Sequence, residues 1–146
     1  MANQTIEILL IEDDPDDIEL TLRVLKTHRL ANKVQVLRDG AEALDYLFAA
    51  GDYSERQMIN GPKVILLDLK LPKINGLEVL QRLKSDSRTR LIPVVILSSS
   101  REEKDVRAGY QLGVNSYIVK PVDFQQFTEA IRSLGLYWVR LNQTPL

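Results

Sequence analysis

Five short apolar runs alternate along the chain with longer segments whose apolar positions recur every three or four residues. The runs are rich in Ile, Val and Leu without polar alternation, which is typical of strands covered on both faces. They lie at Ile6–Ile11, Lys33–Leu37, Val64–Leu67, Val94–Leu97 and Ser116–Val119. The periodic segments predict helices at about Pro15–Arg29, Ala41–Ala50, Gly76–Ser85, Glu102–Leu112 and Asp123–Leu141. This alternation predicts an α/β fold: a doubly wound, five-stranded parallel sheet with helices on both sides.

The 146 residues fit one domain. The longest irregular stretch, Gly51–Lys63, contains Gly51, Asn60-Gly61 and Pro62, which favour turns and end helices. We therefore expect a surface loop there and not a linker between domains.

Composition excludes several classes of chemistry. The chain has no cysteine, which rules out disulfides, thiol catalysis and zinc–thiolate sites. The single histidine, His28, lies near the end of a predicted helix, where a surface or capping role is common. The net charge of −1 gives no electrostatic reason to expect nucleic-acid binding. We see no signal peptide and no apolar stretch approaching the roughly 18 residues that span a bilayer, so we expect a cytoplasmic protein without a membrane partner.

The first strand leads directly into an acidic cluster, Glu12-Asp13-Asp14-Pro15-Asp16-Asp17. Helix formation explains part of it, because Asp14 suits an N-cap, and Asp16 and Asp17 suit the positive end of the helix dipole. It does not explain Glu12 and Asp13. The third strand ends in another acid, Asp68. If the first and third strands are neighbours, these three acids share one pocket at the carboxyl edge of the sheet.

Three carboxylates in one pocket repel one another strongly. At about 4 Å and an effective dielectric constant of about 20, each pair costs about 4 kcal/mol. Such a cluster protonates, unfolds locally or holds a cation. Oxygen ligands without His or Cys favour Mg²⁺ over zinc or copper.

Two other strand ends add a hydroxyl and an ammonium group. Ser98-Ser99-Ser100 follows the fourth strand, and Lys120-Pro121 follows the fifth. Such residues are often merely solvated, but here both follow buried strands of one sheet. A carboxylate nucleophile, a divalent cation, a hydroxyl and an ammonium together suit phosphoryl transfer, in which Lys120 neutralises charge and Ser98 donates a hydrogen bond.

These motifs together resemble the receiver domains of response regulators over about residues 5–135. The resemblance rests on Ile8–Asp14, on Leu67–Pro72 with Asn75-Gly76, on Ile96–Ser98 and on Tyr117–Pro121. It implies a flavodoxin-like (CheY-like) fold with strand order 2-1-3-4-5. It also implies a signalling protein that catalyses only its own phosphorylation and dephosphorylation, and not a conventional enzyme.

The resemblance assigns a role to each of the site residues. Asp68 is the expected phosphoacceptor and Lys120 binds the phosphoryl group, while Ser98 and Tyr117 form the switch pair. Asp13 and Asp68 are expected to bind Mg²⁺ directly, with Glu12 acting mostly through water and the backbone carbonyl of Lys70 as a further ligand. A cis peptide between Lys120 and Pro121 is also implied.

No output domain is evident, so we expect a receiver at residues 5–141 with an extended C-terminal helix, followed by a tail at 142–146. This ending, with Arg38-Asp39-Gly40, is similar to single-domain regulators paired with bacterial and cyanobacterial phytochrome kinases. The expected partner is thus a phytochrome-type histidine kinase. Tyr137, Trp138 and Leu141 either complete the core or extend a homodimer surface built from the fourth helix, fifth strand and fifth helix.

Lys70, two residues after the expected phosphoacceptor, either points to solvent or pairs with the phosphoryl oxygens and slows their hydrolysis. Three rival functions remain. An aspartate-nucleophile phosphatase would need a second acid where Lys70 stands, and a flavodoxin-like flavin binder would need a Ser/Thr/Gly-rich loop where this chain has acids. A degenerate receiver that signals without phosphate would not need the complete set of chemical groups.

Overall fold

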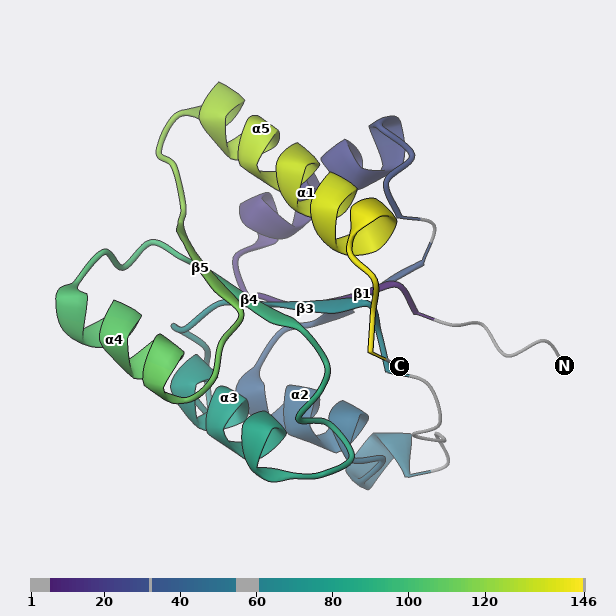
Figure 1. The fold of residues 1–146 in the computed structure, drawn as a ribbon, viewed down its shortest axis with the longest axis vertical. Helices are drawn as coiled ribbons and strands as arrows, with labels where there is room; N and C mark the ends of the chain where they lie inside the picture. The colour runs from purple at the N-terminus through teal and green to yellow at the C-terminus, as the bar shows by residue number, and fades with distance from the viewer. Residues whose placement is uncertain (1–5, 32, 55–60, 146) are drawn as a thin grey trace, which may run out of the picture.

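The computed structural model describes residues 6–31, 33–54 and 61–145. It has one parallel sheet in the order β2-β1-β3-β4-β5, as predicted. Figure 1 shows α1 and α5 side by side on one face of this sheet and α2, α3 and α4 on the other. The strands are β1 (Ile8–Ile11), β2 (Val34–Leu37), β3 (Val64–Leu67), β4 (Val94–Ser98) and β5 (Ser116–Val119). The α-helices are α1 (Pro15–Thr27), α2 (Gly40–Leu47), α3 (Gly76–Ser85), α4 (Glu103–Gln111) and α5 (Phe124–Gly135).

Two helices end earlier than predicted. The α1 helix ends at Thr27 and not at Arg29, because Arg29 has a φ of 53°. The α2 helix ends at Leu47, two residues before Ala49 with a φ of 52°. Positive φ stops a right-handed helix, and neither Arg nor Ala signals that conformation in a sequence.

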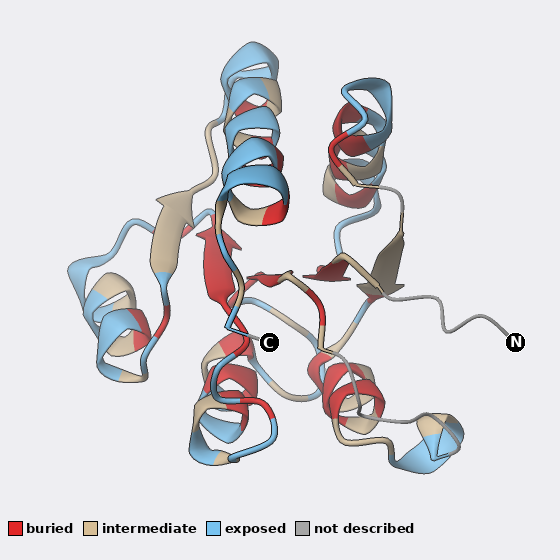
Figure 2. Cartoon of the chain, turned by 45° about the vertical axis from the view of Figure 1, so that its right-hand side comes forward, coloured by how far each residue is buried: buried red, intermediate tan, exposed pale blue. Residues whose placement is uncertain are grey.

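The sheet divides the core into two apolar layers, because successive side chains of each strand point to opposite faces. Leu9, Ile11 and Ile65 belong to the layer beneath α2 and α3, whereas Ile8, Leu10 and Val64 belong to the layer beneath α1 and α5. The central strands β1, β3 and β4 are wholly buried, and the helices bury the sides that face the sheet (Figure 2). The prediction of full burial is wrong for β5 and for all of β2 except Leu37, because the strand order places these two strands at the edges of the sheet.

The predicted final helix changes its geometry partway. After α5, residues Leu136–Leu141 form a π-helical segment, in which the backbone N–H of Asn142 donates to the carbonyl of Tyr137 at 2.6 Å. This segment packs on the domain, because Val139 is buried and its carbonyl accepts a hydrogen bond from Lys63 Nζ at 3.3 Å. The guanidinium of Arg140 also donates to the carbonyl of Arg29.

The C-terminal aromatic residues divide between core and surface. Trp138 packs against the core layer beneath α1 and α5, with its ring edge-on to that of Tyr137. Tyr137 is 50% exposed and Leu141 is 67% exposed. Trp138 therefore completes the core, whereas a dimer surface that includes Tyr137 and Leu141 stays a prediction.

The predicted loop between α2 and β3 begins with a short 3₁₀ helix, η1 (Gly51–Tyr53). Residues 55–60 of that loop, and the outermost residues of the predicted domain and tail, 5 and 146, lie outside the described residues. None of the helices in the described part of the chain is both long and apolar enough to cross a bilayer.

Candidate functional site

The register of the sheet brings four chemically active residues to one edge. Ile11 of β1 pairs with Leu67 of β3, so Glu12 and Asp68 follow at the same level. The backbone N–H of Asp68 donates to the carbonyl of Ile11 at 3.0 Å, which fixes the two acids side by side. On the other side, Ser98 pairs with Val119, and the backbone N–H of Lys120 donates to the Ser98 carbonyl at 2.7 Å.

The ammonium of Lys120 lies among three carboxylates. Its Nζ is 2.6 Å from Glu12 Oε1, 2.8 Å from Asp17 Oδ2 and 3.4 Å from Asp68 Oδ2. The Lys120 side chain is only 11% exposed, so these charges interact with little screening by water. The structure thus places the lysine beside the predicted phosphoacceptor.

The acids also form a group that suits a hard cation. One oxygen from each of Glu12, Asp13 and Asp68 lies within 4.8 Å of the others. Glu12 and Asp68 are buried, whereas Asp13 is exposed and accessible to an entering ion. Three carboxylate oxygens without nitrogen or sulfur ligands fit Mg²⁺.

The loop that follows Asp68 is held tightly. The backbone N–H of Lys70 donates to Asp68 Oδ1 at 3.3 Å, and that of Gly76 donates to the Leu69 carbonyl at 2.8 Å. A Cβ atom at Gly76 would lie 2.2 Å from the Asp68 carbonyl oxygen, so only glycine allows α3 to start this close to the site. The side chain of Lys70 is exposed. A role for its backbone carbonyl as a metal ligand stays a prediction.

An open hollow of about 540 Å³ lies over these residues. Acids of the β1–α1 segment, Asp68, Lys70, Ser99 and Lys120 line it. A phosphoryl group could therefore approach Asp68 from solvent.

Burial and the contacts among these charges shift the pKa values of Glu12 and Lys120. Burial raises the pKa of Glu12 to about 7, and the charge of Asp68 adds to this effect, although the hydrogen bond from Lys120 opposes it. Burial alone would lower the pKa of Lys120. The hydrogen bonds to Asp17 and Glu12 outweigh burial and raise the pKa of Lys120 above its ordinary value.

The predicted switch residues, Ser98 and Tyr117, are joined through Ser100. The fully buried Ser98 Oγ accepts a hydrogen bond from the Ser100 backbone N–H at 3.2 Å, and the Tyr117 hydroxyl donates to the Ser100 carbonyl at 2.8 Å. Ser100 Oγ also lies 2.5 Å from Asp105 Oδ2 in the first turn of α4. We did not predict this role of Ser100 and Asp105.

Asp17 is a third residue whose role sequence reasoning missed. We interpreted it as an acid that favours the helix dipole, but its carboxylate contacts Lys120. Asp17 lies in the first turn of α1, four residues after Asp13, which precedes that helix. That spacing was its only signal, because Lys120 is 103 positions away along the chain.

The predicted cis peptide between Lys120 and Pro121 is wrong, since no peptide bond between described residues is cis. The trans form is the intrinsically preferred one, by about 0.5–1 kcal/mol before proline. With a trans bond, the end of β5 already brings Lys120 Nζ to the carboxylates, so its position requires no cis bond.

Comparison with known proteins gives a consistent result. Residues 8–132 match the response regulator receiver domain family. The chain is 37% identical over 144 residues to response regulator Rcp1 of Synechocystis sp., covering 99% of this chain and 96% of that protein. The crystal structure of Mn²⁺-bound Rcp1 has a TM-score of 0.90 at 36% identity, covering 97% of this chain and 99% of that chain.

Two further solved structures are similar. The phosphorylated cyanobacterial phytochrome response regulator RcpA is 37% identical with a TM-score of 0.90, covering 98% of this chain and 100% of that chain. The bacteriophytochrome response regulator RtBRR is 56% identical with a TM-score of 0.76, covering 97% of this chain and 85% of that chain. Long stretches of this chain thus resemble phytochrome-linked regulators in both sequence and fold.

The raised pKa of Glu12 predicts a pH dependence of stability in metal-free protein. Its usual value is 4.5 and its folded value is about 7, so the folded state retains a proton that the unfolded state releases between these values. This contribution stabilises the protein at low pH and is lost as the pH rises through 7. In urea denaturation with a chelator present, wild type should lose unfolding free energy relative to Glu12→Gln between pH 5 and pH 8.

The matched control is Glu78→Gln, which replaces an exposed acid of α3. Its unfolding free energy should run parallel to that of wild type across the same pH range. A Glu12→Gln curve that also runs parallel to wild type would contradict the prediction.

Proposed function

This chain belongs to the response regulator receiver domain family, and we propose that it accepts a phosphoryl group from a histidine kinase on Asp68 in a Mg²⁺-dependent reaction. The contact of Lys120 with Asp68 and Glu12 at the carboxyl edge of the sheet is the observation that carries this proposal. It sets a nucleophilic carboxylate, a fixed cation and an oxygen-rich metal site side by side.

In the proposed reaction, a carboxylate oxygen of Asp68 attacks the phosphorus of a phosphohistidine on the kinase. The O–P bond forms as the P–N bond breaks, and the released imidazole takes a proton from solvent. Lys120 donates hydrogen bonds to the phosphoryl oxygens, and Ser98 Oγ donates another after it rotates towards them. Asp13 and Asp68 would hold Mg²⁺ directly, with Glu12 and the Lys70 carbonyl assisting. The ion supplies positive charge beside the phosphoryl oxygens.

The switch then depends on Ser100. Movement of Ser98 towards the phosphoryl group removes the acceptor of the Ser100 N–H bond. Ser100 also forms hydrogen bonds with the Tyr117 hydroxyl and with Asp105 in the first turn of α4. Movement of Ser98 would therefore change the hydrogen bonding of Ser100, Tyr117 and α4 together. The equilibrium between two arrangements of the α4–β5–α5 face therefore shifts on phosphorylation.

We assign the phosphodonor to a phytochrome-type histidine kinase. RcpA and RtBRR are phytochrome response regulators by name, and the latter is 56% identical to this chain. His28, the one histidine of the chain, is the exposed C-cap residue of α1 and belongs to no cluster with the site acids. The phosphoryl group must therefore come from a donor outside this chain, which we take to be the phosphohistidine of the kinase.

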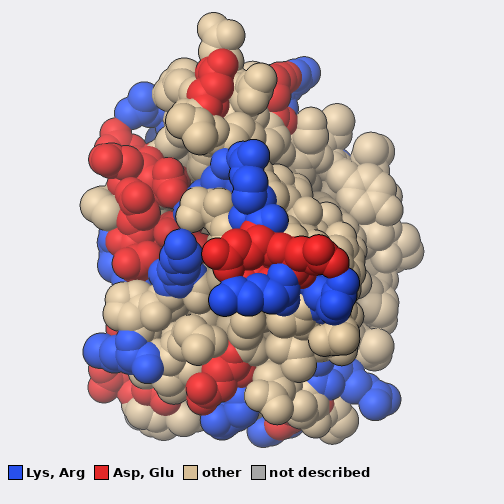
Figure 3. Space-filling model, turned by 90° about the vertical axis from the view of Figure 1, so that its left-hand side faces the viewer, with Lys and Arg blue, Asp and Glu red and all other residues tan. Residues whose placement is uncertain are grey.

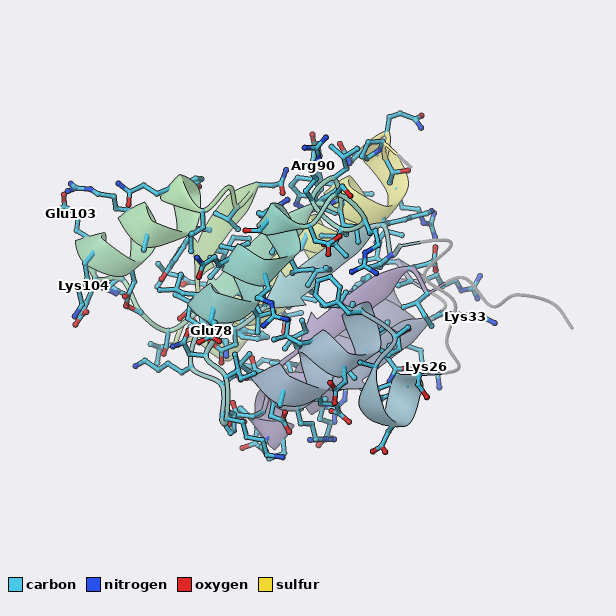
Figure 4. All side chains as sticks on the ribbon, turned by 90° about the horizontal axis from the view of Figure 1, so that it is seen from below. Lys26, Lys33, Glu78, Arg90, Glu103 and Lys104 are labelled. Carbon is cyan, nitrogen blue, oxygen red and sulfur yellow. The ribbon has the colours of Figure 1, made fainter. Side chains whose placement is uncertain are left out.

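The proposed receiver spans residues 5–141, and its output is contact with a second copy through α4, β5, α5 and the C-terminal segment. The half-buried β5 is an edge strand, Tyr137 lies near its residues Ser116 and Ile118, and Tyr110 of α4 and Leu141 of the C-terminal segment are also exposed. Figure 3 shows acidic and basic side chains intermingled on this side of the molecule. On α4 the charges of Glu103 and Lys104 project outwards (Figure 4), and ion pairs join Glu103 to Arg107 and Lys104 to Glu102. Mixed charge of this kind is compatible with self-complementary pairing.

Phosphoryl transfer is tested directly with acetyl phosphate and Mg²⁺, followed by intact-mass measurement. Wild type should gain the mass of one phosphoryl group, and Asp68→Asn should gain none because the amide is not a nucleophile. Chelation of Mg²⁺ should abolish labelling of wild type. Equal labelling of Asp68→Asn would place the acceptor elsewhere.

Lys70 is expected to prolong the phosphorylated state by pairing with the phosphoryl oxygens. Its side chain is exposed beside Asp68, and among the described residues it has no ion pair that would hold it away. Loss of an ion pair worth about 1 kcal/mol corresponds to about a fivefold change in rate. Lys70→Asn should therefore speed loss of the phosphoryl group about fivefold, measured by intact mass after the donor is removed. An unchanged rate would mean that Lys70 simply points to solvent.

The dimer is tested by light scattering after size exclusion. Wild type should elute as a dimer, and the double variant Tyr137→Ser, Leu141→Ser should shift towards monomer because it removes the exposed apolar contacts. Leu91→Ser is the control, since Leu91 is 55% exposed but precedes β4 on another surface. A wild type that is monomeric both with and without phosphorylation would refute the proposed dimer.

A further inference from the structure

One of the carboxylates that contact Lys120, that of Asp17, has no part in the phosphoryl transfer proposed above. Asp17 Oδ2 lies 2.8 Å from Lys120 Nζ, closer than Asp68 Oδ2 at 3.4 Å. The contact joins α1 to the end of β5, which is possible because α1 and α5 lie side by side on one face of the sheet (Figures 1 and 2). The inference drawn from this contact rests on the proposed function and deepens it.

The start of α1 does not need this carboxylate. Asp14 is the N-cap, and its side chain accepts from the backbone N–H groups of Asp16 and Asp17. Pro15 occupies the first helical turn, and Asp16 adds negative charge at the same end of the helix. Asp17 therefore has a role besides helix stability.

Asp17 also stands outside the acidic group that suits a cation. The oxygens that cluster within 4.8 Å come from Glu12, Asp13 and Asp68, and not from Asp17. If that group held a cation, Glu12 and Asp68 would be engaged with it, whereas Asp17 would remain available to Lys120. Of the three acceptors of the ammonium, Asp17 alone is dedicated to it.

We propose that Asp17 is a positioning residue, which holds the Lys120 ammonium at the phosphoacceptor before the phosphoryl group arrives. A lysine side chain is long and flexible, so an unrestrained ammonium is often in the wrong place for transfer. Glu12 and Asp17 approach Nζ from β1 and α1, and together they hold it within reach of Asp68. A charged group that is already in position accelerates a reaction, because no free energy is spent on moving it into place during the reaction. Asp17 acts only through Lys120 and does not touch the phosphoryl group.

The test compares Asp17→Asn with Asp16→Asn. Both variants remove one negative charge from the first turn of α1, but in the described structure Asp16 makes no ion pair. The first readout is the rate at which an amine-acylating reagent modifies Lys120 in metal-free protein, measured by peptide mass spectrometry. Asp17→Asn should raise this rate several-fold because the amine loses a fixed partner, and Asp16→Asn should leave it near the wild-type value.

The second readout is the rate of phosphorylation by acetyl phosphate at a Mg²⁺ concentration that saturates each variant. Asp17→Asn should be slowed about fivefold to tenfold and Asp16→Asn less than about twofold. Asp17→Glu, which keeps the charge, should recover part of the loss. Thermal unfolding of all variants checks that the fold is intact.

The proposal is overturned if the Asp17 and Asp16 variants behave alike in either readout. Increased acylation of Lys120 without slower phosphorylation would also overturn it, since the contact would then be structural only. Acylation requires no phosphoryl transfer, so it separates this proposal from the proposed function. A wild type that takes no phosphoryl group would refute the proposed function, whatever the acylation rates.

Discussion

The site depends on one buried ammonium among acids that would otherwise repel one another. Glu12 and Asp68 are fixed side by side by the backbone bond between β1 and β3, and both are almost inaccessible to solvent. Burial raises the pKa of Glu12, and the charge of the neighbouring Asp68 adds to this effect. Lys120 relieves the repulsion by binding both acids. The ammonium of Lys120, which reduces the repulsion between these acids, is also the positive charge that the proposed phosphoryl transfer would use.

The position of Lys120 follows from the architecture of the sheet. Parallel strands end at the same edge, so residues that follow β1, β3, β4 and β5 meet there without any special loop. The strand order also makes β5 an edge strand. One short element therefore carries Tyr117 within it and Lys120 directly after it, and it borders the surface that we propose for dimerisation. This explains how a change at Asp68 could reach a partner-binding surface over a short path.

That path is a set of hydrogen bonds and not a rigid connection. Ser100 links the buried Ser98, the half-buried Tyr117 and Asp105 of α4 through its backbone and hydroxyl groups. Each partner lies on a different element, so breaking one bond alters the restraint on the other two. Ser100 is therefore the physical link between the chemistry at the strand ends and the α4–β5–α5 surface.

Local pattern determined much of the architecture. The bounds of β3, α3 and β5 agree with the predicted apolar runs and helical periods. These bounds could be predicted because the apolar residues and helix caps that set them are neighbours in the sequence. The placement of Glu12, Asp68, Ser98 and Lys120 at one edge also followed, because each stands at the carboxyl end of a strand of one parallel sheet. Their chemical roles rest on the resemblance to receiver domains and remain predictions.

Tertiary structure alone decided the rest. The positive φ of Arg29 and Ala49, the π-helical turn after Gly135 and the half-burial of the edge strands arise from packing that neighbouring residues do not encode. The same holds for the pairing of Asp17 with Lys120. A sequence pattern reports what a residue needs locally, whereas an ion pair between residues 103 positions apart exists only after the sheet has brought both ends together.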